Sequence, residues 1–326
     1  MSQSILLIHK NAAMAQIEIL KAFVPDIWPL IKQARLPIYL DSTSAEYIPF
    51  QPFCHLLDRV SCVLPHKAFI EFVQQGAQSY SRQTLPLANT VCDTSSILPT
   101  SSILPMLASK LPVAQLHIDV SKSTLCLEFA LNRMNTFAFV AELYSLSVAH
   151  HILCRYYPQL DNPKQYHLVS SNREGLEQLQ ISSSSPQFMG QQHSAIIYKL
   201  KKTSSEEFSD ALVKTDLSFM EQVSSALEGY IGREDLSIEA FSNIIGVSSR
   251  TIQRNLTQES SNYRSIKDAL NIKFAKRVMI DRRSSVADIS AHLGYADSSQ
   301  FIRAFKKSEG ITPLQWRKKS GLTNKQ

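Results

Sequence analysis

The sequence has little of what marks a disordered, fibrous or membrane protein. It holds only 9 glycines and 14 prolines among 326 residues, whereas hydrophobic residues make up 44%; disordered and collagen-like chains are richer in glycine and proline. Its apolar runs are short, and the run at residues 5–8 follows no basic residue, so neither a membrane span nor a secretion signal is expected. This composition predicts a globular, cytoplasmic protein of two domains with no membrane partner.

Cysteine is also scarce, and its pattern excludes the commonest metal and disulfide frameworks. Its five positions, an odd number without a C-x-x-C pair, are Cys54, Cys62, Cys92, Cys126 and Cys154. Cys54 and Cys62 flank His55, but a fourth zinc ligand is missing. His150 and His151 are neighbours on an expected helix, where their side chains diverge by about 100° and cannot share a metal. We therefore expect no metal, no cofactor and a reducing compartment.

Signatures of catalysis are missing as well. No cysteine lies between a proline and a histidine, and neither a glycine-rich phosphate loop nor a Ser/His/Asp signature occurs. The sequence therefore predicts that the protein is not an enzyme and has no catalytic residues.

What the sequence does contain is a basic C-terminal end. Residues 1–215 carry 17 Lys and Arg against 16 Asp and Glu, whereas the chain from Arg250 onward carries 16 against 6. Such a local excess of positive charge attracts polyanions, which means nucleic acid or an acidic membrane surface. Charge alone does not distinguish these two partners.

The hydrophobic pattern changes near residue 210. Before it, helical periodicity occurs at residues 13–23, 65–78, 97–107 and 137–157. Strand-like alternation occurs at residues 114–120, 123–130, 166–170 and 194–200, of which the first two form a hairpin. The polar stretch 201–209 follows, and after it only helical patterns occur. We predict an α+β domain at residues 1–209 and an all-α domain at residues 210–326.

Two stretches of the C-terminal part repeat one another. Residues 238–256 read IEAFSNIIGVSSRTIQRNL, and residues 286–305 read VADISAHLGYADSSQFIRAF. Each contains a short amphipathic helix, a glycine, a polar turn residue and a second helix, which is the helix-turn-helix pattern. Gly246 and Gly294 suit the left-handed turn after the first helix. Ser248 and Asp297 are suited to cap the second helix.

The second helix of each repeat has one apolar and one polar face. At 100° per residue, Leu256 lies beside Ile252 while Arg254 lies on the opposite side. Arg303 holds the equivalent position in the second repeat. An exposed arginine is usually a solvated charge, but its recurrence in both repeats favours reading of bases in the major groove.

We place the first helix-turn-helix unit at residues 237–258 and the second at residues 285–308, joined by a long linker helix at residues 265–281. One such unit alone is a weak signal, because any helical hairpin with a glycine turn imitates it; two with a spacer are specific. At 1.5 Å per residue the linker spans about 24 Å, which is compatible with recognition helices one DNA turn, about 34 Å, apart.

Residues 287–317 extend the match beyond a generic helix-turn-helix. They read ADISAHLGYADSSQFIRAFKKSEGITPLQWR and contain, in order, a Gly-Tyr turn, an F-x-R-x-F-K core and a G-x-T-P-x-x-W-R ending. The C-terminal hundred residues thereby resemble the DNA-binding domain of the AraC family of transcription regulators. The resemblance implies double-stranded promoter DNA and RNA polymerase as partners, and activation as the mode of regulation.

The resemblance also implies site residues. Base contacts are expected from the second helices, at Arg250, Thr251, Gln253, Arg254, Ser298, Ser299, Gln300 and Arg303. Phosphate contacts are expected, with no contact as the alternative, at Ser248, Thr257, Lys306, Lys307, Arg317 and Lys318. Ile302 departs from the family, in which many members have a polar or small residue there, so it contacts a thymine methyl group or nothing.

Residues 185–199, SPQFMGQQHSAIIYK, are similar to part of the arabinose-binding-type ligand domain of one AraC subgroup. The strands are too few for a jelly roll, which needs about eight. The resemblance implies that residues 1–209 bind a small-molecule effector, of unknown identity and binding residues, or form a homodimer. The alternatives are an N-terminal domain that only dimerises or one that is a fused enzyme.

Overall fold

The computed structural model describes residues 4–37, 40, 43–84, 110–111, 114–119, 124–129, 131, 137–156, 162–171, 185–199, 211–213, 217–232, 236–280 and 284–320. The chain forms two compact units. The mixed unit comprises Leu6–Leu36 and Glu46–Asp216. The helical unit comprises Met1–Ile5, Pro37–Ala45 and Leu217–Gln326.

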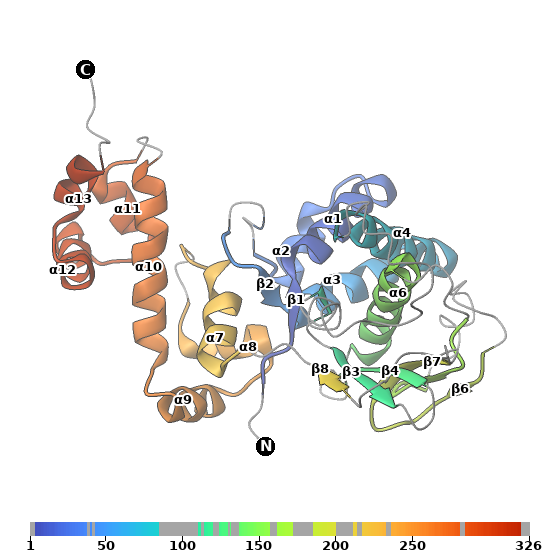
Figure 1. Ribbon diagram of the computed structural model, residues 1–326. Coiled ribbons are helices and arrows are strands. Elements are labelled where there is room, and N and C mark those ends of the chain that lie inside the picture. Colours follow the sequence, from blue (N-terminus) through green and yellow to red (C-terminus); the bar gives the residue numbers. More distant parts are fainter. Residues whose placement is uncertain are drawn as a thin grey trace. The chain divides into compact units, whose positions relative to one another are not determined.

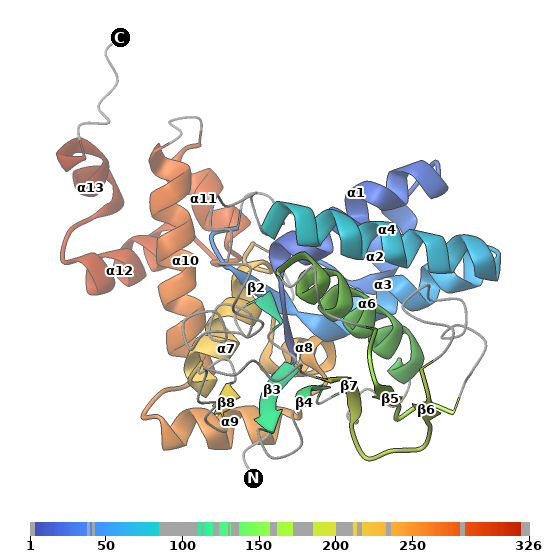
Figure 2. The same ribbon diagram turned by 45° about the vertical axis from the view of Figure 1, so that its right-hand side comes forward.

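Helices make up much of the mixed unit (Figures 1 and 2). They are α1 (Lys10–Phe23), α2 (Trp28–Ala34), α3 (Phe50–Val63), α4 (His66–Thr84) and α6 (Ala138–Tyr156). Helices α1 and α6 both pack against α4, and α2 packs against α3. These contacts bury the apolar stripes of the helices, and Leu146 and Leu153 of α6 have no exposed surface.

A six-stranded sheet completes the mixed unit, with the order β6-β5-β7-β4-β3-β8. Its strands are β3 (Ala114–Asp119), β4 (Thr124–Phe129), β5 (Gln165–His167), β6 (Gln187–Phe188), β7 (Ser194–Lys199) and β8 (Ala211–Val213). Neighbouring strands are antiparallel except β5 and β6. In the central register, Leu127 pairs with Leu116 and with Ile196. A separate antiparallel pair joins β1 (Leu7–His9) to β2 (Tyr47–Pro49).

One buried carboxylate ties α6 to the sheet. Glu142 is fully buried and accepts hydrogen bonds from the backbone N–H groups of Val169 (2.5 Å) and Ser170 (3.1 Å) and from the Ser194 hydroxyl. A buried charge requires such partners. Glu142 therefore fixes α6 to the ends of β5 and β7.

The helical unit is built around one long helix. Its elements are α7 (Phe219–Glu228), α8 (Ile238–Ile245), α9 (Ser249–Gln258), α10 (Tyr263–Ile280), α11 (Val286–His292), α12 (Ser298–Glu309) and α13 (Pro313–Lys319). Helices α7, α9 and α12 all pack against α10. Figure 1 shows α7 to α9 toward one end of α10 and α11 to α13 toward the other.

Two N-terminal segments belong to the helical unit. The Ile5 N–H donates to Gln222 Oε1 (2.8 Å). Ser44 donates its backbone N–H to Glu228 Oε1 (3.2 Å) and its hydroxyl to the same oxygen. We call residues 37–45 the strap. No sequence pattern indicates the strap, because its partners lie more than 180 residues away.

The structure confirms the predicted α+β region followed by an all-α region with two helix-turn-helix units and a long linker helix. The hairpin and the helices expected near residues 13–23, 65–78 and 137–157 are present. Helices α2 and α3 and strands β1, β2, β6 and β8 were not predicted. Residues 97–107 and 201–209, expected as a helix and a polar connection, lie outside the described residues.

Candidate nucleic-acid interface

Helices α8 and α9 form the first helix-turn-helix unit. Ser237 begins α8 by accepting a hydrogen bond from the Ala240 N–H (3.1 Å). Gly246 ends it with a φ of 67°, a left-handed conformation that costs glycine little. Ser248 then caps α9, because its hydroxyl oxygen accepts from the Thr251 N–H (3.2 Å). The expected glycine turn and serine cap are both present.

Helices α11 and α12 form the second unit with the same order of parts. Ser285 and Asp288 make a capping box at the start of α11, Gly294 has a φ of 73°, and Asp297 caps α12 by accepting from the Gln300 N–H (2.8 Å). The Ser285 hydroxyl and backbone N–H donate to the Asp288 carboxylate and hold its pKa below the usual value. The turn between the two helices therefore has the predicted chemistry.

Both recognition helices bury the apolar face that the sequence indicates. Ile252 and Leu256 of α9 and Phe301 and Phe305 of α12 are 0% exposed. The two phenylalanine rings meet edge to face, with centroids 5.9 Å apart. Since these residues recur every four positions, the opposite face of each helix is turned to solvent.

Helix α9 presents a polar and basic outer face. Four of its predicted DNA-contacting residues are exposed: Arg250, Gln253, Arg254 and Thr257. The Thr251 side chain is half-buried, and its hydroxyl lies 2.9 Å from that of Ser248. The Thr257 hydroxyl donates to the Gln253 carbonyl (2.8 Å). The arginines and Gln253 are therefore the longest polar side chains available on this face.

Helix α12 presents a more basic face toward its C-terminal half. Its exposed predicted residues are Ser299, Gln300, Arg303, Lys306 and Lys307. Ser298 and Ile302 are half-buried. Short polar side chains thus occupy the start of the helix, and cations follow in the next two turns.

The two equivalent arginines differ in their surroundings. Arg254 donates from Nε and Nη2 to Oδ1 of the buried Asn255, at 3.4 Å each. The residue after Arg303 is Ala304, which offers no side-chain acceptor. Asn255 therefore orients the guanidinium of α9 through contacts that the alanine side chain on α12 is unable to make.

Helix α13 carries the last two predicted phosphate contacts. Thr312 and Gln315 form its capping box, with Pro313 at its first position. Lys318 is exposed. Arg317 is half-buried and donates from Nη2 to the Ser284 carbonyl (2.9 Å). Arg317 thus holds α13 to the segment before α11, a packing role that the sequence did not indicate.

Polar contacts also brace the first unit against its neighbours. Glu259, just after α9, accepts from the N–H groups of Phe219 (2.8 Å) and Met220 (2.7 Å) at the start of α7. The free N–H groups of a helix start favour a carboxylate there. The Lys267 ammonium donates to the Leu236 carbonyl (3.0 Å). Sequence reasoning missed these contacts because each joins residues at least 31 positions apart.

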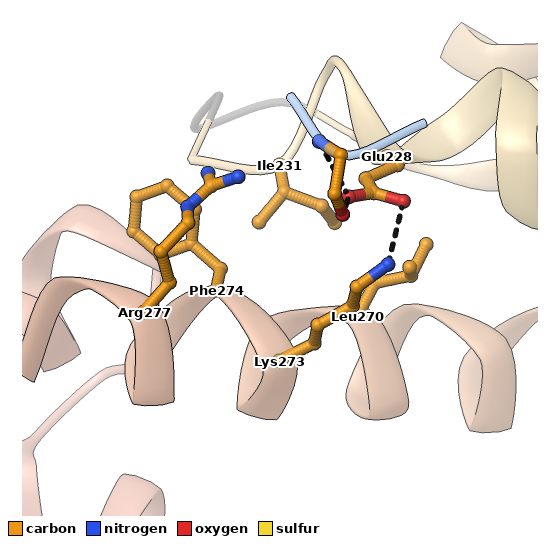
Figure 3. A pocket seen from close by; sticks show the side chains of 7 residues that line it. Glu228, Ile231, Leu270, Lys273, Phe274 and Arg277 are labelled. Carbon is orange, nitrogen blue, oxygen red and sulfur yellow. Dashed lines mark hydrogen bonds and ion pairs between the residues drawn. The ribbon is translucent and has the colours of Figure 1, made fainter. Parts of the chain in front are cut away.

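A cavity of about 120 Å³ lies beside α10 within the helical unit (Figure 3). It is lined by Ser44, Glu228, Ile231, Leu270, Lys273, Phe274 and Arg277. The Glu228 side chain is 12% exposed; one of its oxygens accepts from Ser44 and the other from Lys273 Nζ (3.0 Å). A single carboxylate therefore joins the strap to α10.

The histidines and cysteines considered as metal ligands form no metal site in the part of the chain that the structure describes. There, no group of three His, Cys, Asp or Glu side chains is placed to hold a metal ion. His150 Nδ1 lies 3.0 Å from the Tyr198 hydroxyl, and Cys154 Sγ lies 3.5 Å from His150 Nε2. Burial, with a smaller effect of the neighbouring His151, lowers the pKa of His150 to about 4, and burial raises that of Cys154. The pair is therefore a neutral imidazole and a thiol near pH 7, not an activated nucleophile.

None of the helices that the structure describes is long and apolar enough to cross a membrane.

Comparisons with known proteins match the same part of the chain. The helix-turn-helix domain family matches residues 241–319. The HTH-type transcriptional activator CfaD of Escherichia coli is 26% identical over 125 residues, which are 38% of this chain and 47% of CfaD. The virulence regulon transcriptional activator VirF of Shigella flexneri is 26% identical over 119 residues, 36% of this chain and 45% of VirF. The matched stretch thus spans about half the length of these curated relatives.

A solved structure, that of a DNA-binding transcriptional dual regulator from Escherichia coli K-12, also matches. It is 17% identical with a TM-score of 0.32, and the match covers 34% of this chain and 99% of that chain.

Proposed function

We propose that the protein is a sequence-specific DNA-binding transcription regulator of the AraC type, because residues 241–319 match the helix-turn-helix domain family and transcriptional activators are similar to the same part of the chain. One observation carries the proposal. Two recognition helices, α9 and α12, each bury an apolar face and expose a polar, basic face, and both pack on the same long helix α10. A major groove of B-DNA admits one such helix.

We assign base reading in the first half-site to α9. Its exposed arginines, Arg250 and Arg254, have the forked donors that bind O6 and N7 of guanine, and Gln253 has the amide that binds adenine. Thr251 reaches a base only if it leaves its contact with Ser248. Ser248 and Thr257, near the two ends of the helix, are suited to phosphates.

We assign base reading in the second half-site to α12. Arg303 is the forked donor there, with Ser298, Ser299 and Gln300 at the start of the helix. Half-buried Ile302 offers only an apolar contact, which suits a thymine methyl group. We assign phosphate contacts in this half-site to the exposed Lys306, Lys307 and Lys318. Half-buried Arg317 reaches a phosphate only if it leaves the Ser284 carbonyl.

We further propose that regulation is activation in response to a small molecule. Support for activation is that CfaD and VirF are named transcriptional activators, and activation would involve contact with RNA polymerase. The mixed unit is the part available to bind an effector or a second copy of the chain, since it lies outside the matched residues 241–319.

The test is to select DNA from a random pool with the full chain and to footprint the selected site. A chain with two unlike recognition helices should select an asymmetric site that covers two successive major grooves. Arg303→Ala should change the preferred base in one half and Arg254→Ala in the other. A strict palindrome, protection of a single groove, or selection of no sequence would contradict the proposal.

A further inference from the structure

The second helix-turn-helix unit also contacts Gly232, a residue that follows α7 and precedes the first unit. Gly232 lies in the segment between α7 and α8, with a φ of 92°. A Cβ atom at this position would lie 2.3 Å from Nε2 of His292 and 2.9 Å from its Cδ2. Because real Cβ atoms do not approach so closely, the imidazole edge occupies the space that the missing side chain leaves. Gly232, just before the first unit, therefore rests on His292 of α11 in the second unit.

This contact is part of a stack that includes the linker helix. The His292 ring lies on that of Phe274 of α10, with centroids 5.2 Å apart and planes 19° apart. The guanidinium carbon of Arg277 lies 5.3 Å from the centre of the same phenylalanine ring. Figure 3 shows Phe274 and Arg277 side by side on α10, with Ile231, the neighbour of Gly232, facing them across the cavity. Helix α10, helix α11 and the residues just after α7 thus meet at this stack.

Each unit is also fastened to its own end of α10. At one end, Lys267 binds the Leu236 carbonyl. At the other, Lys276 Nζ pairs with Glu309 of α12 (2.9 Å) and lies 5.6 Å from the centre of the Trp316 ring of α13. Contacts of each unit with its own part of α10 still leave the two units joined to one another only through that helix. The contact between Gly232 and His292 adds a restraint off that axis, because it joins α11 of the second unit to the residues just after α7, and α7 packs against both α9 and α10.

We propose that Gly232 and His292 are positioning residues that fix the spacing of the two DNA half-sites that this protein accepts. The inference rests on the proposed DNA-binding function. Inserting one base pair moves the second half-site by about 3.4 Å and rotates it by about 34° around the duplex. Recognition helices held at a fixed distance and angle are unable to follow both changes, whereas helices free to twist are able to follow part of them.

A double-mutant cycle tests the contact itself. In the full chain, Gly232→Ala should lower the thermal unfolding midpoint of the helical unit for two reasons: a φ of 92° strains alanine, and the added methyl group meets the His292 ring. His292→Ala should remove the second contribution and leave the first. Gly310→Ala is the matched control: its φ is 76° and nothing lies within 4 Å of an added Cβ. Its effect should be the same with and without His292→Ala. Additive effects of the Gly232 and His292 substitutions would overturn the contact as a structural restraint.

A spacing series tests the function of the contact. The selected DNA site is made with the native spacing and with one base pair added or removed between the half-sites. The wild-type chain should lose affinity about tenfold or more at either altered spacing, as expected when base contacts are misplaced. His292→Ala should keep its affinity at the native spacing within about threefold and lose about threefold or less at the altered spacings. The control His193→Ala, in the mixed unit, should behave as wild type.

The outcomes separate this inference from the function on which it rests. If wild type binds a two-groove site but His292→Ala shows the same steep dependence on spacing, the positioning role is wrong and the DNA-binding proposal stands. If wild type tolerates altered spacing, the positioning role is likewise wrong. If wild type selects no DNA, both proposals fail.

Discussion

The two helix-turn-helix units of this chain share a frame and differ in the face that they present. Each has a first helix begun by a serine cap, a glycine with positive φ and a capped recognition helix with two fully buried apolar residues four positions apart. On the outer face, however, Arg250 and Gln253 of α9 correspond to Ser299 and Ile302 of α12. The frame is set by backbone and packing requirements, and the outer face is left free to differ.

The arginine common to both faces sharpens the comparison. Arg254 is oriented by the buried Asn255, whereas Arg303 is followed by an alanine. A side chain that is already ordered loses less conformational entropy on binding. We infer that the arginine of α9 contacts its base from a more fixed conformation, whereas the arginine of α12 is freer to adapt its conformation to the base.

The largest expected effect on stability comes from removing a buried core side chain of one helix-turn-helix unit at a time. Phe305→Ala should cost about 3 to 5 kcal/mol of unfolding free energy, and Leu256→Ala about 2 to 5 kcal/mol, because both side chains are fully buried. Urea unfolding of the full chain measures these losses. Phe188→Ala is the control, since that ring is 47% exposed and its removal should change little.

Under conditions where both variants remain folded, each should lose DNase protection mainly in its own half-site. Equal loss in both halves from Leu256→Ala alone would mean that the units do not have separate frames.

The next largest effect comes from removing the shared arginine from each face. Arg254→Ala and Arg303→Ala should each weaken binding of the selected site by about 1 to 3 kcal/mol and relax preference at one base pair. If Asn255 preorganises its neighbour, Arg254→Ala should be the more costly of the two. Gel-shift titrations against a panel of single-base variants measure both quantities.

Lys307→Ala is the control for base reading. It removes a cation from a phosphate-facing position, so it should weaken all DNA sequences alike and reduce the salt dependence by about one ion. Unchanged affinity and preference after Arg303→Ala would show that this face of α12 does not meet bases.

The helices, glycine turns and caps of the two units could be predicted from the sequence far better than the long-range contacts that hold these units in place. Glycine turns, caps and four-residue apolar spacing are local signals, and the structure has Gly246, Ser248 and Asp297 in the expected roles. The outer faces followed from the same periodicity. The boundaries of α9 and α12 follow within a few residues for the same reason.

The contacts that hold these units in place join residues that are distant in sequence. The strap reaches Glu228 across 184 positions, and Arg317 reaches Ser284 across 33. A glycine at position 232 gives no hint that an imidazole fills its place. In the mixed unit, α2 and α3 were not predicted. Their prolines, Pro29 and Pro52, lie within the first turn of each helix, where proline is tolerated.

A smaller effect is expected from the caps of the recognition helices. Ser248→Ala and Asp297→Ala should each cost about 0.5 to 2 kcal/mol of unfolding free energy, because each removes the acceptor of one helix-start N–H. Asp297→Ala should be the more costly, since a carboxylate also interacts with the helix dipole. Chemical unfolding of the two variants gives the comparison, with Ser248→Asp expected to be neutral or stabilising. A larger loss from Ser248→Ala would show that its bond to Thr251 outweighs the dipole.

The smallest expected difference is in how acid affects the first helix of each unit: the start of α11 should be more sensitive to low pH than the start of α8. Helix α11 begins with a capping box whose Asp288 has a lowered pKa, because the Ser285 hydroxyl and N–H donate to its carboxylate. Helix α8 begins with the Ser237 cap and has Glu239 in its first turn, but Ala240 stands at the position of the capping-box carboxylate. A carboxyl group with a lower pKa in the folded state stabilises that state above its unfolded pKa, and the stabilisation is lost as the pH falls through the folded value. The start of α11 should therefore fray below about pH 4 while α8 is less affected.

Hydrogen-exchange protection factors of the two helix starts, followed from about pH 6 to about pH 3, measure this difference. Other carboxylates titrate in the same range, so Asp288→Asn is the necessary comparison: it removes the titrating group and keeps a hydrogen-bond acceptor. Protection at α11 should then be slightly lower than in wild type at pH 6 and should lose its extra dependence on pH, so that α11 and α8 respond alike. If α11 of the Asp288→Asn variant still frays in acid more than α8, the capping box is not the source of the difference between the two units.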